Sequence, residues 1–134
     1  MDKRRNISSG AKWEDIFGYS RAVRVGNVIE VSGTTAVDEN SEVVGRGDMY
    51  EQARYALGKI ERAIREAGGR LEDVVRTRVY LADMDMFDQA AKAHREFFGE
   101  IKPASSAIKA ILVQEELLVE IEATAIVMER EMET

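Results

Sequence analysis

Two periodicities follow one another along this chain, and their order limits what it can fold into. Apolar and polar residues alternate with a period of two in AVRV from Ala22 and again in VIEVSG, with the turn residues Gly26-Asn27 between the two runs. A two-residue Gly-Asn loop between alternating runs predicts a β-hairpin. The alternation returns at about 74–81, 106–113 and 118–128. Five strands are therefore expected from Ala22 onward.

Between these strands the apolar residues recur at helical spacing, first at about 48–67. Asp48 stands at the N-cap position of this stretch, Glu51 follows three residues later, and Gly68-Gly69 ends the pattern. This is the spacing of a capping box in its Asp form, followed by a glycine terminus. An amphipathic helix with one apolar stripe and a charged outer face is therefore expected here.

A second helix is expected at about 86–98, after the third strand. Either Asp83 or Asp85 is placed to cap its first turn. Apolar and aromatic residues recur along it at intervals of three and four, which places them on one side of a helix. The expected stripe contains Phe87, Ala90, His94 and Phe97.

The order of these elements, ββαβαββ, favours an α+β fold. It has too few crossovers for a doubly wound parallel sheet and too many strands for a helix bundle. Two amphipathic helices on one face of a mixed sheet is the economical packing. A chain of 134 residues is long enough to bury one core. We expect a single domain over 1–134, with a polar N-terminal segment at 1–17 and the core at 18–128.

Two helices can cover only one face of such a sheet. In the last strand, Val119, Ile121, Ala123, Ala125 and Val127 alternate with Glu120, Glu122, Thr124 and Ile126, so apolar residues occur on both sides. We therefore expect the second face to be buried against another copy of the chain.

Composition excludes several classes of function. The net charge is −6, which makes nucleic acid an improbable partner because an acidic surface repels phosphate. There is no cysteine and only one histidine, His94, so thiol catalysis and a histidine-rich metal site within one chain are excluded. No signal peptide and no run of 18 apolar residues is present. We expect a soluble, cytoplasmic protein with no membrane partner and no metal.

The carboxylates of Glu120 and Glu122 are the first candidate site. Two residues apart on one strand, they share a face with roughly 7 Å between their Cα atoms. On a partly buried face, such a carboxylate has a raised pKa or orients a water molecule. The alternative is that both side chains project into solvent at a strand edge. On spacing alone, the second interpretation is favoured.

Three further residues also have two interpretations each. Tyr19 follows Phe17-Gly18 on an entry segment, where its phenol either anchors packing or covers a pocket. Ser32 lies beside Gly33 at the end of a strand, which indicates either a turn or backbone N–H groups presented to a ligand. His94 lies on a helix stripe, which favours a core or interface position over catalysis.

Taken in order, short segments of the chain resemble the Rid family, the reactive intermediate deaminases, also called the YjgF or L-PSP family. The first is Gly18-Tyr19-Ser20-Arg21-Ala22-Val23, where the family has G-P-Y-S-x-A-V. The other matching segments are 26–33, 52–54, 66–69 with 73–77, 97–99, 103–104 and 119–123. Each is short, but their order and spacing together indicate the family over most of the chain.

The resemblance implies a chorismate-mutase-like fold, with a six-stranded mixed sheet and two helices on one face. It also implies a homotrimer whose sheets form a central barrel, with a cleft between each pair of subunits. Well-understood members hydrolyse 2-imino acids to 2-oxo acids and ammonia without a cofactor. Carried over by position, Tyr19, Ser32 and Gly33 are expected to bind a small-molecule substrate, and Glu120 is expected to orient water.

One family residue is missing from this sequence. The family has Pro-Ala-Arg, and the arginine grips the substrate carboxylate; here Ser105 follows Pro103-Ala104, and Ala107 stands where a cysteine is common. A hydroxyl cannot reproduce the two-pronged contact of a guanidinium. Lys102 and Lys109 are the nearby cations that could replace it. Ser105 and Ala107 remain candidates for substrate binding through their place in the cleft.

The sequence therefore supports two functions and disfavours a third. The first is a deaminase or hydrolase of imines, enamines or related small metabolites. The alternative is a non-catalytic module that binds a metabolite, which the loss of the arginine favours. An endoribonuclease or translation inhibitor is disfavoured by the acidic charge and by the lack of a histidine pair for acid–base catalysis.

Overall fold

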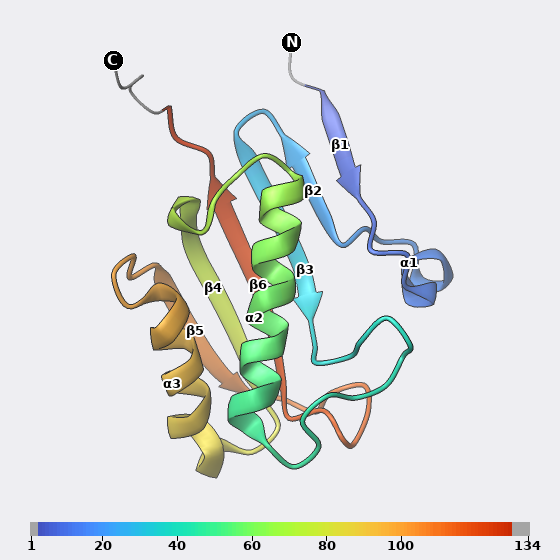
Figure 1. Ribbon diagram of the computed structural model, residues 1–134, viewed down its shortest axis with the longest axis vertical. Coiled ribbons are helices and arrows are strands. Elements are labelled where there is room, and N and C mark those ends of the chain that lie inside the picture. Colours follow the sequence, from blue (N-terminus) through green and yellow to red (C-terminus); the bar gives the residue numbers. More distant parts are fainter. Residues whose placement is uncertain (1–2, 130–134) are drawn as a thin grey trace.

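The computed structural model describes residues 3–129. Their six strands form one sheet in the order β1-β2-β3-β6-β4-β5 (Figure 1). The β4–β5 pair is parallel and the other neighbouring pairs are antiparallel. The sheet is therefore mixed, as the family resemblance implied. The strands are β1 Arg4–Ile7, β2 Ala22–Val25, β3 Val28–Thr34, β4 Val74–Leu81, β5 Ala104–Lys109 and β6 Val119–Ile126.

Two long helices, α2 Met49–Glu66 and α3 Phe87–Phe98, lie side by side on one face of this sheet (Figure 1). The shorter helix α1, Lys12–Phe17, stands at the side of the molecule, beyond the β1–β2 edge. Both long helices begin within one residue of their expected starts. Each follows an aspartate cap: Asp48 accepts the Glu51 N–H at 3.0 Å, and Asp83 caps the short 3-10 turn before α3.

The reciprocal half of the expected capping box does not form. The Asp48 N–H donates to Gly45 O at 2.9 Å instead of to the Glu51 side chain. The Gly45 backbone has a φ of +73°, a left-handed turn conformation that glycine adopts without strain. Because Gly45 O in this turn accepts the Asp48 N–H, that N–H is not available to the Glu51 side chain.

The core lies between the sheet and α2. Alternate residues of β6, from Val119 to Ala125, are buried and face the helices, where Leu57, Ile60 and Ile64 are fully buried. The expected stripe of α3 is partly wrong. Phe98, at the last turn, is 2% exposed, whereas Phe87, at the first residue, is 43% exposed. The buried residues of α3 are Ala90, Ala93 and Phe98, so the side of the helix that contains them faces the sheet, and Phe87 lies off it.

The expected polar N-terminal segment contains a strand that the sequence pattern did not reveal. Three of the four residues of β1 are exposed, so they show no apolar alternation. The strand forms because β2 offers an unpaired edge, and Arg4 to Ile7 pair with Val25 to Ala22. β5 also differs from expectation: it starts at Ala104, directly after Pro103, and ends at Lys109.

The face of the sheet opposite α2 and α3 is not covered by a helix in residues 3–129 (Figure 1). Polar side chains pair across its strands. Thr124 donates to Glu30 at 2.5 Å, and Arg78 lies 3.8 Å from Glu122. Coverage of this face by another copy of the chain stays a prediction.

Shortening a side chain under α2 is expected to destabilise the fold strongly. Leu57 is 0% exposed, so Leu57→Ala leaves a cavity and should lower the free energy of unfolding by about 2–5 kcal/mol. Arg62→Ala, on the exposed side of the same helix, should change it by less than about 0.5 kcal/mol. Denaturant titration at one fixed protein concentration measures both. Equal losses for the two variants would contradict this core.

Candidate functional site

An irregularity in the pairing of β3 with β6 shapes the candidate site. Val31 pairs with Ala123 and Thr34 with Ile121. Two residues of β3, Ser32 and Gly33, therefore lie opposite one residue of β6. This is the count of a β-bulge, which bends the strand and redirects side chains. Two of the four residues carried over by position thus occupy the bulge itself.

Glu120 lies directly against Gly33. A Cβ atom built at Gly33 would come within 2.9 Å of the Glu120 carboxyl carbon, so any other residue would displace this carboxylate. β6 is an interior strand, between β3 and β4, and Glu120 is partly buried on it. The interpretation that Glu120 and Glu122 lie at a strand edge is therefore wrong, although the Glu122 side chain remains 33% exposed.

The environment of Glu120 favours its protonated form. Burial raises the pKa of its carboxyl above the ordinary value of 4.5, and the charge of Glu122 raises the pKa further. The nearby charge of Arg21 acts in the opposite direction and lowers it. A carboxyl of this kind exchanges a proton at a higher pH than an exposed glutamate does. This suits a group that takes a proton from water and returns it.

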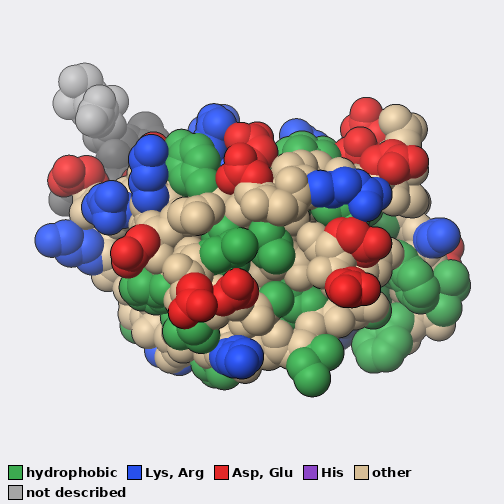
Figure 2. Space-filling model, turned by 90° about the horizontal axis from the view of Figure 1, so that it is seen from below, with side chains coloured by type: hydrophobic (Ala, Val, Ile, Leu, Met, Phe, Trp, Pro, Cys, Tyr) green, Lys and Arg blue, Asp and Glu red, His purple; other side chains and the backbone are tan. Residues whose placement is uncertain are grey.

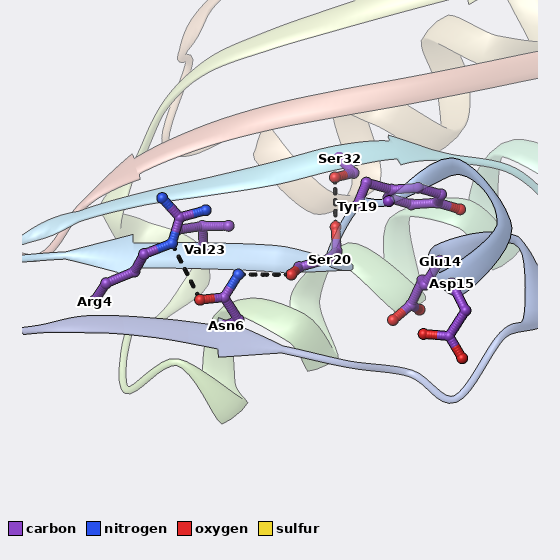
Figure 3. A pocket seen from close by; sticks show the side chains of 9 residues that line it. Arg4, Asn6, Glu14, Asp15, Tyr19, Ser20, Val23 and Ser32 are labelled. Carbon is purple, nitrogen blue, oxygen red and sulfur yellow. Dashed lines mark hydrogen bonds between the residues drawn. The ribbon is translucent and has the colours of Figure 1, made fainter.

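Tyr19 and Ser32 line a hollow of about 490 Å³ (Figure 3). The Ser32 hydroxyl donates to Ser20 O at 2.6 Å, and the Ser32 N–H donates to Arg21 O at 3.0 Å. That N–H is therefore used within the fold and is not free for a ligand. Tyr19 packs edge-on against Phe17, with ring centroids 6.1 Å apart. The remaining lining residues are Arg4, Asn6, Glu14, Asp15, Gly18, Ser20 and Val23.

Ser105 and Ala107 lie in a different part of the fold. Both are on β5, at the far edge of the sheet, and β4 separates them from β6. The Thr77 hydroxyl lies 2.8 Å from Ser105 Oγ and 2.9 Å from His94 Nε2, so Ser105 shares the helix side of the sheet with a residue of α3. Glu120 is on the opposite side. One copy of the chain therefore does not bring Ser105 and Glu120 together.

The backbone of β5 faces outward at these two residues. The Ala110 N–H donates to Leu81 O on β4 at 2.9 Å. Alternate residues of a strand direct their N–H groups to the same side. The N–H groups of Ser105 and Ala107 therefore point away from β4, toward the open edge of the sheet.

Neither lysine considered as a replacement cation lies beside Glu120. Lys109 is on β5, opposite Leu81, and Lys102 precedes that strand; both are exposed. The cation that influences Glu120 is Arg21, which the sequence reasoning missed. The available signal was its place in Gly18-Tyr19-Ser20-Arg21, two residues after the expected site residue Tyr19.

Two kinds of feature are absent from the part of the chain that the structure describes. No group of three or more His, Cys, Asp or Glu residues in 3–129 is arranged to hold a metal ion. No helix in the same residues is long and apolar enough to cross a membrane.

Comparison with known proteins identifies the family. The family model described as Endoribonuclease L-PSP matches residues 11–127. A solved Mycobacterium tuberculosis member of the YjgF/YER057c/UK114 family is 41% identical, with a TM-score of 0.85 over 93% of this chain and 100% of that one. The chain belongs to the Rid, or YjgF/L-PSP, family, and its fold is the α+β, chorismate-mutase-like fold that the resemblance implied.

Two curated relatives agree with this assignment. An uncharacterized protein of Streptomyces coelicolor is 40% identical over 104 residues, which cover 78% of this chain and 77% of the relative. A protein of Acinetobacter baylyi named 3-aminoacrylate deaminase RutC is 34% identical over 107 residues, which cover 80% of this chain and 85% of that protein.

Neutralising Glu120 is expected to stabilise the fold at neutral pH. Because folding raises the pKa of Glu120, the stability that its protonated form provides is present below pH 4.5 and is lost as the pH rises through the higher folded pKa. Glu120→Gln keeps a neutral side chain of the same shape at every pH. It should therefore unfold at higher denaturant than the wild type at pH 7.

At pH 4 the same two proteins should differ little in stability. Glu115→Gln, in an exposed loop, is the control and should show no such dependence on pH. A Glu120→Gln variant that is less stable than the wild type at pH 7 would mean that the ionised carboxylate is the form favoured by the fold.

Proposed function

We propose that this protein is a cofactor-independent deaminase, a hydrolase of small imines and enamines. The half-buried carboxyl of Glu120, held against Gly33 with a raised pKa, is the observation on which the proposal rests. The similarity to a protein named 3-aminoacrylate deaminase supports a substrate of the enamine or imine class.

In the proposed reaction, Glu120 orients a water molecule toward the imine carbon. The water oxygen bonds to that carbon while Glu120 takes one proton from the water and passes it to the imine nitrogen, which gives a neutral carbinolamine. Glu120 then takes the hydroxyl proton and returns it to the amino nitrogen as the carbon–nitrogen bond breaks, so that ammonia leaves and a carbonyl remains. For a 2-imino acid, water and the imine become a 2-oxo acid and ammonia. A carboxyl whose pKa lies above its ordinary value suits both the loss and the return of this proton.

We further propose that the site is a cleft between subunits of a homotrimer. Tyr19, Ser32, Gly33 and Glu120 lie on one part of the sheet, and Ser105 and Ala107 lie on its far edge. A cleft that contains both groups requires two copies of the chain. The outward N–H groups of β5 would then face the reacting nitrogen or oxygen from the neighbouring copy, as donors that stabilise developing charge.

Exposed apolar residues support this association. In one copy, Trp13, Ile16 and Phe17 of α1 are between 49% and 83% exposed, and Ile108, Ile111 and Val113 near the end of β5 are between 50% and 103% exposed. Figure 2 shows green hydrophobic side chains among charged ones on the end of the molecule seen there. Where such residues form a contiguous patch, the patch marks an interaction surface.

Imines generated in place by an amino-acid oxidase provide the test. Semicarbazide traps the imine that escapes hydrolysis, so an active protein lowers the absorbance of the semicarbazone. The wild type and Glu115→Gln should both lower it, whereas Glu120→Gln should lose at least about 100-fold in rate, the usual contribution of a general base. Hydrolysis no faster than in buffer would exclude this activity.

A matched pair of glycine variants checks the position of the carboxylate. Gly33→Ala should reduce the rate as Glu120→Gln does, because its Cβ displaces the Glu120 side chain. Gly58→Ala makes the same change in α2, where nothing lies within 4 Å of the added atom, and should leave the rate unchanged. Equal rates for both variants would show that the position of the Glu120 carboxylate does not affect hydrolysis.

The second candidate is a metabolite-binding module without catalysis, and Ser105 in place of arginine favours it. A ligand that binds the folded chain raises its stability by RT ln(1 + [L]/Kd). Thermal denaturation with a panel of small carboxylates and amides distinguishes the candidates. Saturable stabilisation by a compound that is never converted would support binding, and turnover of the stabilising compound would support the enzyme.

A further inference from the structure

Arg21 is a buried cation beside the residues of the candidate site. It is 8% exposed, it directly precedes β2, and its backbone carbonyl accepts the Ser32 N–H. Its guanidinium carbon lies 5.6 Å from the ring centroid of Tyr19, and its Nη2 donates to Gly33 O at 2.6 Å. The side chain thus contacts Tyr19 and Gly33, and its charge acts on Glu120.

Most of the hydrogen-bonding capacity of this guanidinium is unused. An arginine side chain has five N–H donors, and in the described residues one of its nitrogens, Nη2, is hydrogen-bonded. Nε is fully buried without a hydrogen-bond partner. Nη1 also has no hydrogen bond in 3–129, and unlike Nε it is not sealed from solvent. Buried polar groups are almost always paired. Because Nε is sealed, Nη1 is the free donor that a small anion can reach.

The charge of Arg21 is also not neutralised by direct contact. Within residues 3–129, no carboxylate lies within 4.0 Å of its guanidinium, although Glu120 and Glu14 both sense its charge. A buried charge is costly unless a counter-ion accompanies it. An anion placed beside Nη1 would supply both the missing charge and the missing hydrogen-bond acceptor.

We propose that Arg21 binds the carboxylate of the substrate, and so takes the role that an arginine at position 105 would have had. The inference rests on the function proposed above and names the residue that selects carboxylated substrates. The planar guanidinium matches the two oxygens of a carboxylate. Glu14 and Glu120 are coupled to Arg21 by charge, and Glu120 is coupled to Glu122. Lys59 is a cation coupled to Arg21, and these carboxylates outnumber it. This balance disfavours a phosphate dianion relative to a singly charged carboxylate.

Binding of pyruvate, compared with that of pyruvamide, tests this without requiring turnover. Pyruvamide has nearly the same shape and no charge. By calorimetry, the wild type should bind pyruvate saturably and at least tenfold more tightly than either pyruvamide or inorganic phosphate. Arg21→Gln should lose this preference. Arg21→Lys should retain part of it, because an ammonium keeps the charge but not the planar fork.

Arg62→Gln removes the same charge from an exposed position of α2 and is the matched control, with binding expected to equal that of the wild type. Circular dichroism verifies that each variant is folded, and Arg21→Lys keeps the test decisive if Arg21→Gln does not fold. A wild type that fails to bind pyruvate, or binds phosphate equally well, would overturn the inference.

Turnover separates this inference from the proposed function. With imines that do or do not have a carboxylate, Arg21→Gln should raise KM at least tenfold for the carboxylated imine alone. A purely structural role would change both substrates alike. If Glu120→Gln abolishes hydrolysis while Arg21→Gln behaves as the wild type, the enzyme stands and the role of Arg21 is refuted. If no imine is hydrolysed but pyruvate binding depends on Arg21, the carboxylate site stands and the enzyme is refuted.

Discussion

The irregular pairing of β3 with β6 is the constraint on which the candidate site depends. By placing Ser32 and Gly33 opposite a single residue of β6, the bulge brings a residue without a side chain beside Glu120. The carboxylate can then lie against the backbone of β3, in the interior of the sheet, and lose part of its hydration. Its raised pKa follows from this burial and from Glu122. A regular ladder would have placed a side chain where the carboxylate now lies.

The elements of the fold that bury an apolar face could be predicted from the sequence. β4 has the expected bounds of 74–81, and the hairpin turns at Gly26-Asn27 as its sequence indicates. β1 could not be predicted, because its residues remain exposed and their strand conformation comes from the edge of β2. β5 ends at Lys109, earlier than the sequence predicts, for a related reason: apolar residues continue to Val113, but Ile111 and Val113 are exposed in one copy of the chain.

The same division applies to the site. The positions of Tyr19, Ser32, Gly33 and Glu120 could be expected from the family resemblance, because short motifs mark them. The bulge could not, since it depends on a count of residues across two strands that are far apart in sequence. Its place two residues after Tyr19 is a signal for Arg21, but too weak to assign it a role, because any polar residue before a strand has similar spacing. Arg21 differs from Arg24 because it is buried and its own Nε has no hydrogen-bond partner, whereas Arg24 Nη1 donates to Ala67 O at 2.7 Å.

The substitution of arginine by serine on β5 has a consequence for proton transfer at Glu120. Within one copy, a cation on β5 would lie at the far edge of the sheet, whereas the charge of Arg21 in the same copy acts on Glu120 and lowers the pKa of its carboxyl. If a carboxylate ligand neutralises Arg21, this effect weakens and the pKa of Glu120 rises. By linkage, ligand binding and proton uptake by Glu120 then favour each other. Under the proposed function, ligand binding would therefore shift Glu120 toward the acid that returns a proton to the departing nitrogen, and ligand release would shift it back toward the base that takes a proton from water.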